Sequence, residues 1–172
     1  MLHLNGEIKI ECWGDADFAT DKVDRKSVSA CVLTMDGAVI LWSCKKQSGV
    51  SLSRMETEFI SASQAGRELL DVKELLSELK LQVCEPMPMW MDNPAAIKQL
   101  EAENSTSSAK HVDIRFKFIC HHARESTVMP QFVKSEKMMA DILTKSLTAP
   151  RMEELRGVFN LKAIQADVEE EC

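Results

Sequence analysis

The sequence lacks three features that would place it in a class at once. No apolar run approaches the roughly 18 residues that a membrane-spanning helix requires. Residues 1–5 do not read as a signal peptide. No internal repeat or low-complexity block is visible along the chain. We therefore expect an intracellular protein with no membrane partner.

Cysteine is present, but it is not grouped as a metal site or a disulfide framework requires. None of the six cysteines belongs to a Cys-x-x-Cys pair, and three fall within expected strands. Buried free thiols are the better interpretation. The one dense group of ligand-type residues is Cys120-His121-His122, and neighbours on a helix point about 100° apart. We expect no metal there.

The charge balance does not exclude a polyanionic partner. The net charge is −6, which at first argues against nucleic acid, because phosphate neutralisation dominates that affinity. Four of the 27 acidic residues lie in the last six positions, however, so residues 1–166 carry 23 acidic against 21 basic side chains, a net of −2. We expect one domain over residues 1–163 and a disordered acidic tail over 164–172.

The hydrophobic pattern predicts an α/β protein with a mixed sheet and a single core. An alternating segment from Ile8 to Cys12 predicts a strand whose end carries Asp15. The other expected strands cover residues 28–34, 38–44, 87–91 and, at the sheet edge, 128–133. Helices are expected over about residues 54–70, 94–100, 112–122, 138–146 and 151–159. The first of them either continues to residue 79 or is followed by a second helix that ends there. Residues 105–108 are an expected loop.

Four acids stand out by their positions in these expected elements. Asp15 and Asp92 end strands that should be parallel neighbours, because a crossover helix connects the two parts of the sheet. Glu58 lies on that crossover helix, and Asp141 lies in the helix after the last strand. Carboxylate oxygens suit Mg²⁺ or Mn²⁺ better than zinc. A group of four such acids needs cations to offset its like charges.

The register of the crossover helix distinguishes Glu58 from Glu56. An apolar stripe on this helix (Met55, Phe59, Ala62, Gly66 and Leu69) includes the position of Glu58, so its carboxylate should face the core and need a cation. Glu56 is rotated by about 200° and should face water, where it can cap the helix after Ser53. The alternative is that Glu58 meets a lysine at the rim of the core.

Seven short motifs occur in the order found in the RNase H domain of Ty1/copia-type retrotransposon Pol polyproteins, which the chain resembles over roughly residues 6–160. The motifs are residues 14–19 (GDADFA), 24–27 (DRKS), 42–47 (WSCKKQ), 52–59 (LSRMETEF), 91–93 (MDN), 110–115 (KHVDIR) and 140–145 (ADILTK). The resemblance implies an RNase H-like fold with a mixed five-stranded sheet. It also implies hydrolysis of the RNA strand of an RNA/DNA hybrid during reverse transcription.

The family's four catalytic and metal-binding acids correspond to Asp15, Glu58, Asp92 and Asp141. The resemblance therefore implies two Mg²⁺ ions, with Mn²⁺ as a substitute, and no small-molecule cofactor. In that two-metal mechanism one ion activates a water and the other stabilises the leaving oxygen. The implied partners are an RNA/DNA hybrid and the reverse transcriptase part of the same polyprotein. The implied location is the cytoplasm, within a virus-like particle, or the nucleus.

Contacts with the hybrid are harder to assign, because phosphate contacts have no sequence signature. Candidates for backbone contacts are Lys45, Lys46, Lys110, Lys134 and Lys145, with Asn93 as a possible partner of a 2′-hydroxyl. For any one of these lysines, a solvated surface residue is the better interpretation. Trp42 and Trp90 lie within expected strands, and we expect them in the core rather than stacked on bases.

The sequence departs from the family at several positions. It has Arg54 and Met55 where a Ser-Thr pair is usual, and Met138 where Asn is usual. Residues 133–137 contain no histidine, which many cellular RNases H have before the last acid. One alternative is a catalytically inactive or domesticated copy that acts as a binding or scaffold domain. Another, an exonuclease or integrase-like member of the same superfold, requires a different order of acids.

Overall fold

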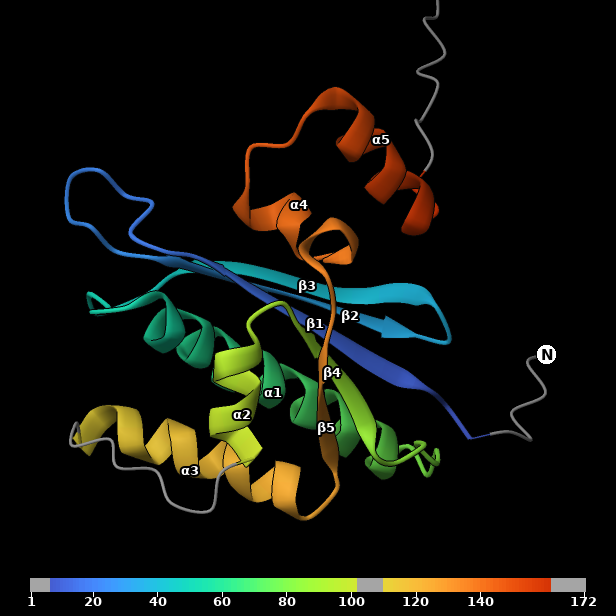
Figure 1. Cartoon of the computed structure of the whole chain (residues 1–172). Helices are drawn as coiled ribbons and strands as arrows, with labels where there is room; N and C mark the ends of the chain where they lie inside the picture. The colour runs from blue at the N-terminus through green and yellow to red at the C-terminus, as the bar shows by residue number, and fades with distance from the viewer. Residues whose placement is uncertain (1–6, 102–109, 162–172) are drawn as a thin grey trace, which may run out of the picture.

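The computed structural model describes residues 7–101 and 110–161, with the backbone alone for residues 110–116. A five-stranded sheet lies between two layers of helices (Figure 1). Helices α1, α2 and α3 cover one face of the sheet, and α4 and α5 lie over the other. The expected loop at 105–108 and the expected tail at 164–172 lie outside the described residues.

The sheet is mixed, as the sequence predicts, with the strand order β3-β2-β1-β4-β5. The first three strands pair antiparallel, whereas β4 pairs parallel with β1 and β5 pairs parallel with β4. Pro130 lies in the edge strand β5, where its missing N–H interrupts no ladder. The strands are β1 (Ile10–Asp17), β2 (Val28–Met35), β3 (Ala38–Lys46), β4 (Met87–Met91) and β5 (Val128–Phe132).

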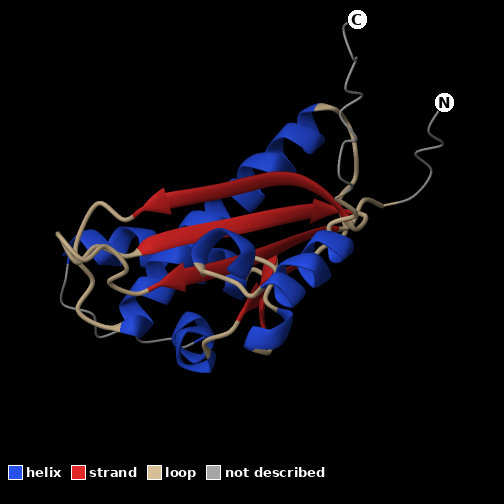
Figure 2. Cartoon of the chain, turned by 90° about the horizontal axis from the view of Figure 1, so that it is seen from above, coloured by secondary structure: helices blue, strands red, loops and turns tan. Residues whose placement is uncertain are grey.

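A two-residue turn joins β2 to β3 at the predicted position. Asp36 and Gly37 both have positive φ, 49° and 82°, which matches the right-handed twist of a hairpin. The Asp36 carboxylate also accepts a hydrogen bond from the backbone N–H of Lys9, at 3.1 Å. This bond ties the hairpin to the start of β1. Figure 2 shows the three long strands in the sheet from above.

The crossover is a single helix, α1 (Arg54–Glu78), rather than two. Ser53 caps it, and Phe59, Ala62 and Leu69 are buried against the sheet. Met55 was expected in this buried stripe but is 40% exposed. Thr57, two residues later, faces the sheet and shares a 3.2 Å hydrogen bond with Ser27, so Met55 is turned to the opposite side.

Each face of the sheet has its own core. The larger cluster packs α1, α2 and α3 against the sheet and includes Ile10, Leu33 and Met89. On the other face Val32, Val133 and Met138 pack with the stacked rings of Trp13 and Trp90, whose centroids are 5.3 Å apart. Cys12, Cys31 and Cys120 are buried free thiols, as expected.

Two residues of β3 contradict the expectation of burial. Trp42 is 68% exposed, and the thiol of Cys44 is also exposed. Both lie in the sheet's other edge strand, on a side that α4 and α5 cover only in part. Trp42 lines an open groove there together with Leu143 and Phe159.

The C-terminal helices differ most from the sequence prediction. A helix was expected over residues 138–146, but α4 (Asp141–Thr144) is one turn long. Residues 138–140 are buried, and the backbone at Met138 is extended, with φ −68° and ψ 113°. Pro150, expected to separate two helices, lies in the first turn of α5 (Ala149–Val158), where its missing N–H costs nothing. The remaining helices are α2 (Pro94–Glu101), α3 (Lys110–Arg124) and the short 3₁₀ helix η1 (Ser135–Lys137).

None of the helices in the described part of the chain combines the length and the apolar character needed to cross a membrane.

Candidate metal centre

Three of the four predicted acids meet at one edge of the sheet. Asp15 projects from β1, Glu58 from the second turn of α1, and Asp92 follows the last residue of β4. One carboxylate oxygen from each lies within 4.8 Å of the other two. Because β1 and β4 are parallel neighbours, they bring Asp15 and Asp92 to the same edge, as the sequence predicts.

The fourth acid reaches this group through a lysine. Asp141 is the first residue of α4, and its Oδ1 lies 2.5 Å from Nζ of Lys145, four residues later. The same amine lies 3.3 Å from Oδ1 of Asp15 and 3.9 Å from Oδ2 of Asp92. The four acids therefore surround one site, together with one cation of the chain itself.

Hydroxyl groups hold the carboxylates in place. Thr144 donates a short hydrogen bond to Oδ2 of Asp15, and Ser135 donates to Oδ2 of Asp92 at 3.0 Å. Ser61, three residues after Glu58, donates to the backbone carbonyl of Asp15 at 2.6 Å. None of these three hydroxyls was predicted from the sequence. Thr144 had the best signal, since it lies within the motif that contains Asp141.

The acids repel one another strongly enough to alter their protonation. Burial, followed by the negative charges of Asp15 and Asp92, raises the pKa of Glu58 to about 9. Burial also raises the pKa of Asp15, which is 0% exposed, although Thr144 and Lys145 partly oppose this rise. Burial alone lowers the pKa of Lys145, but the hydrogen bond with Asp141 and the nearby carboxylates raise it above its ordinary value.

The donor set fits a hard divalent cation. All the converging ligand atoms are carboxylate oxygens, the type that Mg²⁺ and Mn²⁺ prefer. A cation here favours the charged carboxylates, and so opposes the burial and the mutual repulsion that raise the pKa of Glu58 and Asp15. The arrangement is therefore compatible with a divalent metal, and zinc is a poor match, because neither sulfur nor imidazole belongs to the group.

Glu56 and Glu58 separate as the helix register predicts. Oε2 of Glu56 accepts a hydrogen bond from the N–H of Leu52 at 2.7 Å, and its own N–H donates to Oγ of Ser53 at 3.1 Å. Glu56 therefore caps α1. Glu58 is half-buried and belongs to the carboxylate group.

Unlike the acids, the candidate hybrid-binding residues that the structure describes do not converge on one site, and several of them already have partners within the protein. Oδ1 of Asn93 accepts hydrogen bonds from the N–H groups of Ala95 and Ala96, so this oxygen caps α2. The amine of Lys46 pairs with Asp21 at 2.5 Å and with Asp24 at 2.9 Å. Lys134 is exposed, and the side chain of Lys110 lies outside the described part of the chain. Lys145 was expected to contact the hybrid backbone, but its amine lies among the carboxylates.

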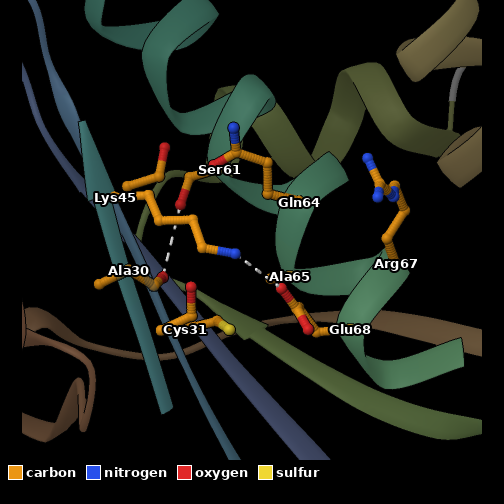
Figure 3. A pocket seen from close by; sticks show the side chains of 10 residues that line it. Ala30, Cys31, Lys45, Ser61, Gln64, Ala65, Arg67 and Glu68 are labelled. Carbon is orange, nitrogen blue, oxygen red and sulfur yellow. Dashed lines mark hydrogen bonds and ion pairs between the residues drawn. The ribbon is translucent and has the colours of Figure 1, made fainter. Parts of the chain in front are cut away.

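Lys45 lies beside a separate polar cleft between α1 and strands β2 and β3 (Figure 3). The cleft has a volume of about 160 Å³, and the amine of Lys45 pairs across it with Glu68 at 3.3 Å. Cys31 also lines the cleft, and burial raises the pKa of its thiol to about 12. The thiol is therefore protonated and unreactive at neutral pH.

Comparison with known proteins identifies relatives among retrotransposon polyproteins. The chain is 31% identical over 139 residues to the retrovirus-related Pol polyprotein from transposon TNT 1-94 of Nicotiana tabacum, a match that covers 81% of this chain and 10% of that protein. It is 30% identical over 148 residues to the corresponding polyprotein from transposon RE1 of Arabidopsis thaliana, covering 86% and 10%. The chain thus spans about a tenth of the length of these relatives. No family model matches it.

Solved structures identify the fold. The crystal structure of LC11-RNase H1 in complex with an RNA/DNA hybrid superposes with a TM-score of 0.57 and 17% identity, covering 78% of this chain and 93% of that one. At this identity the likeness concerns the fold alone. The homologues of this chain are therefore Ty1/copia-type retrotransposon Pol polyproteins, at about 30% identity over most of the chain, and its fold is that of RNase H domains.

Proposed function

We propose that this chain is a ribonuclease H that hydrolyses the RNA strand of RNA/DNA hybrids with the help of two divalent ions, Mg²⁺ or in its place Mn²⁺. One observation carries the proposal. Carboxylate oxygens of Asp15, Glu58 and Asp92 lie within 4.8 Å of one another in an RNase H fold. The relatives are retrovirus-related Pol polyproteins, which supports a role in reverse transcription beside a reverse transcriptase partner.

The roles of the residues follow from their positions. Asp15, Glu58, Asp92 and Asp141 would hold the ions, and bound ions would supply activation of a water and stabilisation of the leaving oxygen. Thr144 and Ser135 donate hydrogen bonds to Oδ2 of Asp15 and Oδ2 of Asp92 and so fix the orientation of these carboxylates. These two acids are therefore arranged before the substrate arrives.

The proposed substrate, an RNA/DNA hybrid, rests on the shared fold and on how RNA differs chemically from DNA, and not on contacts with particular bases. LC11-RNase H1, which shares the fold, was solved with an RNA/DNA hybrid. A protein can distinguish RNA from DNA by the 2′-hydroxyl and by groove shape. We therefore expect cleavage of the RNA strand at many sequences.

The test compares three end-labelled duplexes: an RNA/DNA hybrid, an RNA duplex and a DNA duplex. With Mg²⁺ the wild type should cut only the RNA strand of the hybrid, and EDTA should stop the reaction. Asp15→Asn should be inactive. Asp17→Asn removes a charge from the same strand but outside the carboxylate group, so it should retain activity.

Two results contradict the proposal. Cleavage that persists in EDTA or in Asp15→Asn means that the carboxylate group is not the active site. Hybrid binding without cleavage by the wild type instead supports an inactive copy that serves as a binding domain.

A further inference from the structure

Lys145 places a positive charge of the chain inside the proposed metal centre. Its Nζ lies 2.5 Å from Oδ1 of Asp141, 3.3 Å from Oδ1 of Asp15 and 3.9 Å from Oδ2 of Asp92. A surface ion pair joins one acid to one base, but this amine faces three acids from three separate segments of the chain: β1, the residue after β4, and α4. It therefore lies where the carboxylates converge.

The amine and a metal ion compete for the same oxygen atoms. Oδ2 of Asp15 accepts the hydrogen bond from the hydroxyl of Thr144, and Oδ1 is the oxygen of Asp15 that pairs with the amine of Lys145. The close oxygen of Asp141 is likewise its Oδ1. A divalent ion bound to these two oxygens brings a second positive charge to the lone pairs that the ammonium uses. Two positive charges at the same partly buried oxygens repel each other, which favours exchange of one cation for the other.

The amine of Lys145 can move out of the carboxylate group without a change in the fold. It follows the last residue of α4, with extended backbone angles of φ −119° and ψ 145°. Its side chain is 35% exposed and has an unbranched four-carbon stem, so a change of rotamer takes the amine to solvent. Thr144, by contrast, is short and part of the helix, and it can keep its hydrogen bond to Asp15.

We propose that Lys145 is an exchangeable counter-ion of the metal centre. Its amine occupies the carboxylate group in the metal-free protein and moves to solvent when a divalent ion binds. Lys145 is thus a positioning residue: it keeps the acids together without metal, and it reduces the affinity for metal. This inference rests on the proposed function for the identity of the ion.

The first test measures Mg²⁺ binding by calorimetry and thermal unfolding in EDTA. Lys145→Met keeps the apolar stem but removes the charge. It should bind Mg²⁺ more tightly than the wild type, by about fivefold or more, and should unfold at a lower temperature in EDTA. Lys137→Met is the matched control, because Lys137 is an exposed lysine in η1, and it should behave as the wild type. Equal or weaker Mg²⁺ binding by Lys145→Met overturns the proposal.

A second test follows the lysine itself, and it does not require Lys145→Met to fold. In wild-type protein with ¹³C-labelled lysine, the Lys145 side-chain resonance is identified by its absence from the spectrum of Lys145→Arg. Saturating Mg²⁺ should move this resonance toward the positions of solvated lysines, and an unchanged resonance overturns the proposal. If the wild type binds no Mg²⁺, the proposed function fails as well. If wild type and Lys145→Met bind Mg²⁺ equally, only the role of Lys145 fails.

Discussion

At the scale of single residues, Glu56 and Glu58 show how two similar side chains acquire different roles. Both lie in the first two turns of α1. Glu56 accepts a backbone hydrogen bond near the helix start, whereas Glu58 lies among other carboxylates. The difference follows from the angle of about 200° between them on the helix.

Isosteric substitutions should separate these roles. Glu58→Gln should abolish hybrid hydrolysis, and the metal-free protein should be as stable as the wild type or more stable, because a buried carboxyl group with a raised pKa is replaced by a neutral amide. Glu56→Gln should retain most of the activity and cost at most about 1 kcal/mol of unfolding free energy. Activity assays and denaturant unfolding measure both effects. An inactive Glu56→Gln beside an active Glu58→Gln contradicts the assignment.

The raised pKa of Glu58 predicts how the stability of the metal-free protein depends on pH. Its ordinary value is 4.5 and its value in the fold is about 9, so between these values the folded state binds more protons than the unfolded state. Its stabilising contribution is complete below pH 4.5 and is lost as the pH rises toward 9. Asp15, whose pKa is also raised, acts in the same direction. Lys145 stays charged and keeps its contribution to the stability of the fold over this whole pH range, because its pKa lies above the range.

The melting temperature in EDTA should therefore fall as the pH is raised from about 5 to about 9. In Glu58→Gln the slope should be smaller, and with saturating Mg²⁺ it should also be smaller, because the ion favours the charged carboxylates. A melting temperature that rises over this range, or an equal slope in Glu58→Gln, contradicts the placement of Glu58.

At the scale of elements, the contact between α1 and α3 depends on a glycine. A methyl group on Gly66 would overlap Cδ1 of Ile119 and lie 3.3 Å from its Cγ1. Ile119 is fully buried, so it has little room to move. The absence of a side chain at Gly66 therefore lets the two helices approach each other.

Gly66→Ala should lower the unfolding free energy by about 1–3 kcal/mol, despite the higher helix propensity of alanine. Gly157→Ala is the control, since Gly157 lies in α5 and a methyl group there meets nothing within 4 Å. This control should leave stability unchanged or raise it by up to about 1 kcal/mol. Thermal unfolding of both variants gives the comparison, and a neutral Gly66→Ala contradicts the close packing.

The elements that the sequence predicted well have regular patterns. Strand alternation and the cap at Ser53 located the strands and α1 within a few residues. The prediction failed where packing overrides the pattern. Met138 has helical spacing with its neighbours, but it is fully buried in an extended segment, which shortens α4. Trp42 alternates like a core residue, yet the helices leave its edge strand partly open.

The same contrast applies to the metal centre. Asp15, Glu58 and Asp92 were predicted to converge because strand ends and a helix register fix their directions, whereas Asp141 was expected within a longer helix than α4. The position of Lys145 was not predicted, because it depends on the one-turn length of α4. The hydroxyls of Ser135 and Thr144 were missed for a similar reason: only the folded chain brings them to Asp92 and Asp15.

At the scale of the whole molecule, the distribution of charge predicts weak binding of the hybrid. Residues 1–166 carry a net charge of −2, and several surface lysines are already paired, such as Lys45 with Glu68 and Lys46 with Asp21. Binding should therefore be weak and should fall steeply with added salt. Fluorescence anisotropy with a labelled hybrid measures both properties.

Removal of residues 167–172 should strengthen this binding modestly, because four acidic side chains are lost. The effect should be greatest at low salt. Affinity that does not change on removal of these residues shows that their charge does not act on the hybrid.

Four segments far apart in the sequence, β1, α1, the residue after β4, and α4, bring their acids to one site, and we propose that this site binds divalent ions. Anomalous diffraction from crystals grown with Mn²⁺ shows whether it does. We expect a manganese peak bound by Asp15, Glu58 and Asp92, with the amine of Lys145 displaced from Asp15. A map with no peak at these carboxylates, and with Lys145 still among them, would contradict divalent-ion binding at this site.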